Sequence, residues 1–174
     1  CFSYNKRDKK LEDHGIAANV KPGSGPRHLV FSPNGRYAYL MNELSGKVIV
    51  YSYSDGKLKE LQSIAADNAN AHGGADIHVS PDGMFVYTST RLKGDGITIF
   101  RVGNKGTLTR VGAQLTGKHP RNFAITPNGN FLLVACRDDN SIQVYSRDKD
   151  TGLLKNTHQD IVLSHPVCVK FYPE

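Results

Sequence analysis

The stretch 26-PRHLVFSPNGRYAYLMNE-43 decides the fold, because the chain repeats it. Residues 75-ADIHVSPDGMFVYTSTR-91 and 120-PRNFAITPNGNFLLVACR-137 are copies of the same unit, and a fourth copy begins at 165-HPVCVKFYP-173. The anchor prolines Pro33, Pro81 and Pro127 lie 48 and 46 residues apart. Self-similarity at a fixed period of this length predicts a repeat architecture.

Each unit contains the signals of four short strands. The Pro-Asn-Gly and Pro-Asp-Gly triplets favour tight turns, because proline fixes φ and the two residues after it tolerate positive φ. The aromatic and β-branched runs around them favour strands, and no segment has a helical period. The first two strands of each unit are almost continuously apolar, so both of their faces should be covered. Four-stranded antiparallel units that bury one another are the blades of an all-β protein, a β-propeller.

The repeat also sets the expected boundaries. It predicts a partial blade at 1–18, blades at about 25–66, 73–115 and 119–163, and a closing inner strand at 165–173. This amounts to about three and a half blades, whereas closed propellers have about 4–8. We therefore expect the chain to be the C-terminal part of a single propeller domain, with the N-terminal half of the same propeller as its partner.

Composition narrows the function classes. The chain carries a net charge of +6, but its Lys and Arg are mixed with Asp in turns, which favours a small anion over nucleic acid as the partner. No apolar run approaches the length needed to span a membrane. The three cysteines, Cys1, Cys136 and Cys168, lack the spacing of a disulfide framework or a zinc site. They indicate a reducing compartment, so we expect a cytoplasmic protein, while an export signal ahead of Cys1 stays open.

The repeat supplies an internal control, because a residue that the blade requires should recur in every copy. At four positions the copies instead differ, and polar residues replace apolar ones in only some of them. These positions hold Arg27, Ala75, Arg121 and Val167; His28, Asp76, Asn122 and Cys168; Val30, His78 and Ala124; and Glu43, Arg91 and Arg137.

The turn geometry brings these positions together. A hairpin that turns near Asn34 places Arg27 opposite Asn42 and next to Glu43. The variable positions then fall at one end of their blades, which is one mouth of the propeller channel. His72 and His119 lie on the loops just before that end.

Simpler explanations exist for individual residues. Arg27 and Glu43 could form only a cross-strand ion pair, and His78 could be a core histidine. His72 and His119 could be ordinary loop residues, and Arg137 could belong to a polar turn. They explain poorly why the charges gather at one end of the blades.

At this level of detail the motifs resemble a known family. The blocks GSGPRHLVFSPNGRYAYLMNE (23–43), HGGADIHVSPDGMFVYTSTR (72–91) and GKHPRNFAITPNGNFLLVACRDDNSIQVYSRDKDTG (117–152) are similar to the seven-bladed propeller lactonases. That family includes the propeller type of 6-phosphogluconolactonase, a hydrolase of the pentose phosphate pathway, and the carboxymuconate lactonizing enzymes. The resemblance covers essentially the whole chain and corresponds to the C-terminal half of the family's proteins.

The resemblance implies roles for several residues. Arg27 and Glu43 match proposed active-site positions of the family. The histidine of the family's ADIH block corresponds to His78. Arg91 and Arg121 match the arginines of the following blades. A histidine motif that the family carries in its N-terminal half has no counterpart in this chain.

Lactone hydrolysis requires an activated water and an electrophile for the developing oxyanion. We expect Arg27, paired with Glu43, to stabilise the oxyanion, and Glu43, His28 or His78 to act as general base. Arg91 and Arg121 should hold the phosphate or carboxylate of a phosphosugar lactone or carboxylated lactone. The other residues expected on the substrate side are Asp76, Asn122, His72 and His119. No cofactor is expected.

Two other functions stay open. In a carboxymuconate cycloisomerase the same arginines would hold carboxylates, and a histidine or Glu43 would donate a proton to the alkene carbon. A non-catalytic propeller would instead use the basic mouth to bind a protein. Metal-dependent lactonases need several carboxylates and carboxamides, and only Glu43, Asp76 and Asn122 qualify, so no metal is expected. No GxSxG motif is present, and we expect Cys168 to be structural.

Overall fold

The chain consists of antiparallel β-sheets joined by short turns. A computed structural model describes residues 1–67 and 69–172. A separate hairpin pairs β1 (Phe2–Asn5) with β2 (Lys10–Asp13). The first two large sheets have the strand orders β3 (Pro26–Phe31), β4 (Tyr37–Asn42), β5 (Lys47–Ser54), β6 (Lys57–Ala65), and β7 (Gly74–Val79), β8 (Phe85–Thr90), β9 (Gly96–Val102), β10 (Leu108–Leu115).

The third sheet has a divided outer edge. It contains β11 (Pro120–Ile125), β12 (Phe131–Cys136), β13 (Ser141–Arg147), β14 (Leu154–Asn156) and β15 (Ile161–Val162), and both β14 and β15 pair with β13. A single turn of 3-10 helix, η1 (Arg137–Asp139), joins β12 to β13. No helix in the described residues is long and apolar enough to cross a membrane.

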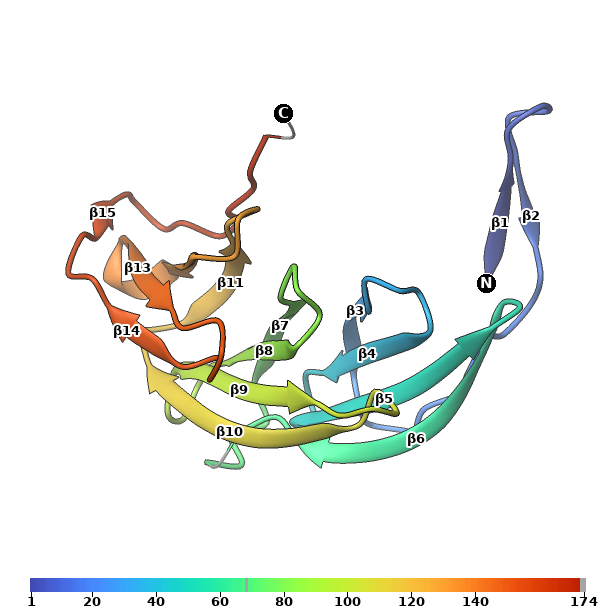
Figure 1. The fold of residues 1–174 in the computed structure, drawn as a ribbon, viewed down its shortest axis with the longest axis horizontal. Helices are drawn as coiled ribbons and strands as arrows, with labels where there is room; N and C mark the ends of the chain where they lie inside the picture. The colour runs from blue at the N-terminus through green and yellow to red at the C-terminus, as the bar shows by residue number, and fades with distance from the viewer. Residues whose placement is uncertain (68, 173–174) are drawn as a thin grey trace.

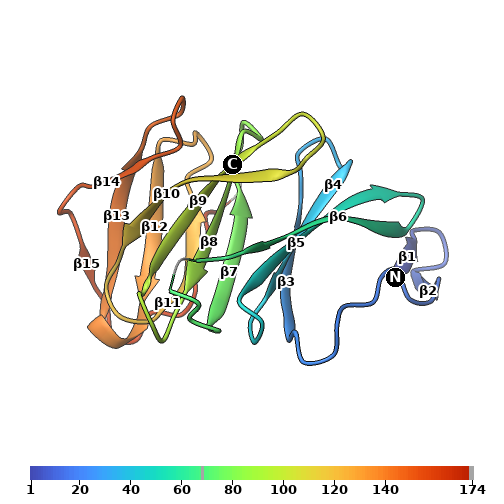
Figure 2. The ribbon, with the colours of Figure 1, turned by 90° about the horizontal axis from the view of Figure 1, so that it is seen from below.

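The sheets follow one another along an arc (Figure 1). The first strands of the three sheets, β3, β7 and β11, lie on the concave side, and the outer strands β6 and β10 lie on the convex side. Figure 2 shows the same three sheets side by side from below. Successive four-stranded sheets in this arrangement are propeller blades, so the predicted all-β propeller fold is confirmed.

Side chains that alternate along the strands hold the blades together. In β8, Val86 packs toward the first sheet in a core with Tyr39 and Met41. Its neighbours Phe85 and Tyr87 point the other way, into a core shared with the third sheet. Because successive residues of a strand face opposite sides, every residue of β8 is buried. This burial explains why β8 begins with three large apolar residues in succession, Phe85–Tyr87, and continues with small polar ones.

Two glycines allow close backbone approach, Gly73 within the second blade and Gly74 between the first and second blades. A Cβ atom added to Gly73 would lie 2.4 Å from the carbonyl oxygen of Arg91, and one added to Gly74 would lie 2.9 Å from that of Asn42. Both distances are shorter than side-chain carbons tolerate. The HGGAD segment is therefore a tight connection between blades.

All three inner strands carry a β-bulge at the same position of the repeat. The register shifts between Pro26 and His28 in β3, between Gly74 and Asp76 in β7, and between Pro120 and Asn122 in β11. The prediction that Arg27 lies opposite Asn42 is therefore wrong, because Arg27 is the inserted residue and Pro26 pairs with Asn42. A bulge turns the inserted side chain away from the regular alternation and increases the local twist.

The two ends of the chain differ from the complete blades. Residues 1–18 contain only the β1–β2 hairpin, whose strands are mostly exposed. The predicted closing strand 165–173 forms no ladder over residues 165–172, and Pro173 lies outside the described residues. An inner strand needs the second strand of its own blade, which the described chain does not supply. The segment is held by its Val169 amide, which donates to Oδ1 of Asn122 at 2.7 Å.

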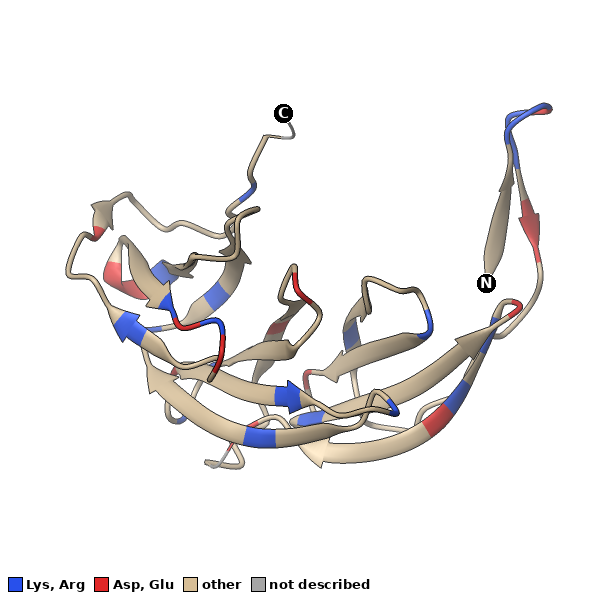
Figure 3. Ribbon diagram, in the orientation of Figure 1, with Lys and Arg blue, Asp and Glu red and all other residues tan. Residues whose placement is uncertain are grey.

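Charged residues are spread over turns and outer strands, with both signs interspersed (Figure 3). One charged pair is buried between the second and third blades. The guanidinium of Arg147, whose side chain is fully buried, donates to Asp82 at 2.7 Å, to the Tyr87 hydroxyl at 2.8 Å and to the Gly129 carbonyl at 3.1 Å. It thereby ties the Pro-Asp-Gly turn of one blade to the third strand of the next.

The Arg147 contact gives a stability prediction. Asp82→Ala should lower the free energy of unfolding by about 3 kcal/mol, because it leaves a buried guanidinium without its counter-charge. Asp82→Asn should cost a similar amount, because it removes the same charge and turns an NH₂ group toward the guanidinium. Asparagine preserves the bonds within the turn, as Asn34 does in the first blade, where its Oδ1 accepts from Ser32 and Arg36. Urea unfolding of both variants measures the losses, and an Asp82→Asn variant as stable as the unmodified protein would contradict the role of the charge.

Candidate functional site

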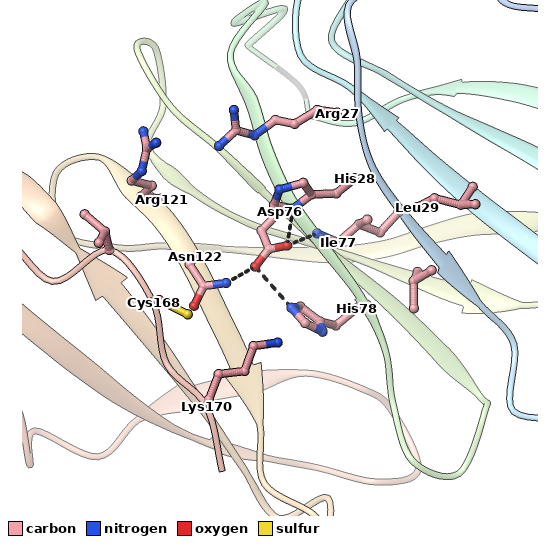
Figure 4. A pocket seen from close by; sticks show the side chains of 12 residues that line it. Arg27, His28, Leu29, Asp76, Ile77, His78, Arg121, Asn122, Cys168 and Lys170 are labelled. Carbon is pink, nitrogen blue, oxygen red and sulfur yellow. Dashed lines mark hydrogen bonds and ion pairs between the residues drawn. The ribbon is translucent and has the colours of Figure 1, made fainter. Parts of the chain in front are cut away.

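A cleft opens between the inner strands of the three blades. It has a volume of about 560 Å³. Strands β3, β7 and β11 and the C-terminal segment 165–172 surround it (Figure 4). The lining residues are Arg27, His28, Leu29, Val30, Asp76, Ile77, His78, Arg121, Asn122, Val167, Cys168 and Lys170.

The cleft is built from equivalent positions of the repeat. His28, Asp76, Asn122 and Cys168 all occupy one position, and neighbouring copies are in contact there. The separations along the chain between contacting residues are 48 for His28 and Asp76 and 46 for Asp76 and Asn122. Residues one repeat apart in the sequence are therefore in direct contact in the structure.

The carboxylate of Asp76 is the centre of the cleft floor. Its side chain is only 4% exposed, and it accepts five hydrogen bonds. Nδ1 of His28 lies 2.7 Å from Oδ1, and Nε2 of His78 lies 3.1 Å from Oδ2. The remaining donors are the Ile77 and Phe123 amides, at 2.9 and 3.2 Å, and the side-chain amide of Asn122.

These contacts determine the ionisation of Asp76. Burial by itself raises the pKa of this carboxyl. Hydrogen bonds from His78, His28 and the Phe123 amide, together with the charge on His78, outweigh burial and lower the pKa to about 2. The group is therefore a carboxylate at neutral pH and accepts hydrogen bonds from all five of its partners.

The two histidines lie on the cleft surface. The His28 side chain is 42% exposed and that of His78 is 29% exposed. The His78 ring also packs edge-to-face on Phe123, with 4.8 Å between ring centroids. Both histidines are therefore oriented by protein contacts on one side and accessible on the other.

Arg27 and Glu43 pair as predicted, but only Arg27 lines the cleft. Nη1 of Arg27 donates to Glu43 at 3.1 Å, and its Nε donates to the Ala75 carbonyl at 2.8 Å. A guanidinium has five N–H groups, so three remain for a ligand. Figure 4 shows the Arg27 and Arg121 guanidinium groups facing each other at one end of the cleft.

Glu43 lies between two arginines. Its second oxygen accepts from Nη2 of Arg91, which comes from the next blade. Partial burial favours a higher pKa for the Glu43 carboxyl, but the hydrogen bonds and charges of Arg91 and Arg27 lower it. A carboxylate neutralised in this way is a poor general base, which leaves the histidines as the basic groups of the cleft.

Three residues predicted on the substrate side lie elsewhere. Arg91 is 6% exposed, and besides Glu43 its guanidinium contacts the Gly73 and Gly74 carbonyls and Nε2 of His119. Nδ1 of His119 in turn lies 3.4 Å from Oδ2 of Asp138, and neither residue lines the cleft. His72 donates to the Leu44 carbonyl and lines a different cavity, together with Lys21 and Lys47. The sequence placed these residues near the correct end of the blades but did not reveal which way they face.

The structure also adds Lys170, which the sequence analysis did not select. It occupies the repeat position of His78, so a comparison extended to the fourth copy identifies it. Figure 4 shows its side chain reaching toward the His78 ring, at the end of the cleft away from the arginines. In the described residues neither Arg121 nor Lys170 forms an ion pair with a carboxylate. Arg27, Arg121 and Lys170 against Asp76 make the cleft cationic, which suits an anionic ligand.

The described residues contain no group of three or more His, Cys, Asp or Glu side chains that could hold a metal ion. Arg137 is paired with Asp138 at 2.7 Å, in agreement with its interpretation as part of a polar turn.

Comparison with known proteins identifies the family. The model of the family described as lactonase, 7-bladed β-propeller, matches residues 1–171. A 6-phosphogluconolactonase of Formosa agariphila is 48% identical over 153 residues, which are 85% of this chain and 43% of that protein. The 6-phosphogluconolactonase of Bacillus subtilis is 35% identical over 179 residues, which are 98% of this chain and 50% of that protein.

Solved structures agree with these relatives. A candidate 6-phosphogluconolactonase from Bacteroides uniformis superposes with a TM-score of 0.95 at 57% identity, over 98% of this chain and 50% of that one. The periplasmic gluconolactonase of Pseudomonas aeruginosa superposes with a TM-score of 0.88 at 32% identity, over 99% of this chain and 50% of that one. This chain spans about half the length of the proteins that it matches. This chain therefore belongs to the seven-bladed β-propeller lactonase family.

Proposed function

We propose that the protein hydrolyses a sugar lactone that carries an anionic group, most simply a phosphosugar lactone, in the cleft between its inner strands. One observation carries this proposal: in a chain of the lactonase family, arginine and histidine side chains line a cleft large enough for a small anionic ligand. Relatives named 6-phosphogluconolactonase support the phosphorylated substrate.

The proposed reaction uses groups that face the cleft. A water molecule, deprotonated by His28 or His78, attacks the lactone carbonyl carbon, and the carbonyl oxygen becomes an oxyanion. The uncommitted N–H groups of Arg27 stabilise this oxyanion, and Glu43 holds the guanidinium in place. The ring C–O bond then breaks, the ring oxygen takes up a proton, and the product is an open hydroxy acid.

Arg121 and Lys170 are the proposed contacts for the substrate's anionic group. Both line the cleft, and planar guanidinium groups bind phosphate or carboxylate through two parallel hydrogen bonds.

Cytoplasmic location, expected from the cysteines, stays a prediction that cell fractionation tests.

Replacing Arg27 tests the oxyanion role. In the protein at its natural length, Arg27→Met should lower kcat/KM for 6-phosphogluconolactone by about 100- to 1000-fold, because it removes a charged donor to the oxyanion. Arg36→Met is the matched control, since Arg36 lies on the exposed turn of the same hairpin. Unchanged turnover in the Arg27 variant would overturn this role.

Parallel assays separate the candidate functions. Turnover of carboxymuconate in place of the lactone would establish the cycloisomerase, and stable binding of a protein partner without turnover of either compound would favour a binding scaffold.

A contrast between two arginines tests which one binds substrate. Arg121→Met should raise KM for the phosphorylated lactone by about 10- to 100-fold with little change in kcat, because it removes a charged hydrogen bond to the substrate. Unphosphorylated gluconolactone should be affected much less. Arg91→Met should instead lower kcat and the free energy of unfolding, because Arg91 is buried against Glu43. Steady-state kinetics with both lactones and urea unfolding decide the matter, and a KM effect confined to Arg91 would reverse the assignment.

A further inference from the structure

We propose that Asp76 is a positioning residue that fixes the proton positions on two histidines of the cleft. It holds His28 and His78 so that Nε2 of His28 and Nδ1 of His78 face the cleft as proton acceptors. This inference rests on the proposed lactonase function and deepens it, because it specifies which imidazole atoms are available to a water molecule.

The hydrogen bonds around Asp76 determine which nitrogen of each ring carries a proton toward the carboxylate. Three of its five donors cannot become acceptors at the atoms concerned: the backbone amides of Ile77 and Phe123 and the NH₂ group of Asn122. The orientation of the Asn122 amide is fixed in turn, because its oxygen accepts from the Val169 amide. A carboxylate can only accept hydrogen bonds, so the histidine atoms that face it must carry protons.

The proton positions on the two rings follow from this. Nδ1 of His28 and Nε2 of His78 are the protonated atoms, at 2.7 and 3.1 Å from the two carboxylate oxygens. In a neutral imidazole the other nitrogen then carries a lone pair. For His28 this arrangement is the reverse of the one that free histidine side chains favour, with the proton on Nε2.

The surroundings of the two rings support an acceptor role on the cleft side. The charged groups that line the same cleft are Arg27 and Arg121 at one end and Lys170 at the other. None of them is a carboxylate that would compete for a water's proton, and Asp76 is occupied by its donors. The positive charges also favour a deprotonated water between them.

The repeat shows that the blade does not require Asp76. The same position holds His28, Asn122 and Cys168 in the other copies, and all three inner strands keep their bulge at the preceding residue. A carboxylate at this position in the middle copy reaches a ring on the strand before it and an amide on the strand after it.

Nitrogen NMR of ¹⁵N-histidine-labelled protein tests the proton positions directly. His28 should give the shifts of a ring protonated at Nδ1, and His78 those of a ring protonated at Nε2. In Asp76→Asn, the new NH₂ group must face at least one of these N–H atoms, so at least one ring should change its protonated nitrogen or lose its fixed state. A wild-type His28 protonated at Nε2 would overturn the proposal.

Kinetics test whether this orientation serves catalysis. Asp76→Asn should lower kcat for 6-phosphogluconolactone by about 100-fold or more, with KM within a few-fold, because a misplaced proton disables the base and leaves the arginines intact. Asp82→Asn is the matched control: it makes the same change in the same blade and weakens the Arg147 contact, but it should leave kcat and both imidazole spectra unchanged.

The two measurements separate the two proposals. Wild-type spectra as expected, without lactone turnover, would overturn the lactonase function and leave the orientation of the histidines intact. Turnover that survives Asp76→Asn at full kcat would overturn the positioning role and leave the lactonase standing. The wild-type spectra decide the proton positions even if the Asp76 variant does not fold.

Discussion

The structure depends on one constraint: the middle blade has apolar side chains on both faces and must be covered on both. Val86 and Phe100 need the first blade, while Phe85, Tyr87 and Ile99 need the third. Burial of this apolar surface is worth roughly 25 cal/mol per Å² and holds the three sheets face to face. Once the sheets are stacked, equivalent residues of neighbouring inner strands lie next to each other. The site is a consequence of that stacking, because its contacts between blades join residues about one repeat apart.

Some positions of the repeat build the scaffold, and others vary from blade to blade. The turns and apolar strands recur in every copy and make the scaffold, whereas the positions next to the bulge vary. The bulge itself allows this variation, because it releases one residue per inner strand from the regular alternation and directs it elsewhere. Arg27 and Arg121 occupy the inserted position in the first and third copies, and alanine occupies it in the second. The Ala75 carbonyl there accepts from Arg27.

The sequence was sufficient to predict the blades and the end at which functional residues gather, because the copies could be compared with one another. It also predicted the Arg27–Glu43 pair and the group of His28, Asp76, His78 and Asn122. It did not predict the bulges, since the inner strands lack a clear alternation that an extra residue would interrupt. It also could not show that Arg91 is buried in an ion pair with Glu43 or that His72 lines another cavity. The direction of a side chain at a loop depends on packing between blades. Lys170 was within reach, since it shares the repeat position of His78.

The donors to Asp76 come from all three inner strands, and this has a consequence for how the molecule folds. Contacts between residues nearly fifty positions apart close long loops, so we expect them to form later than the contacts within each blade. Until the neighbouring blades arrive, Asp76 stays hydrated and its histidines stay free. The cleft therefore takes shape in the docking steps, when the carboxylate loses its water and receives the five hydrogen bonds that replace it.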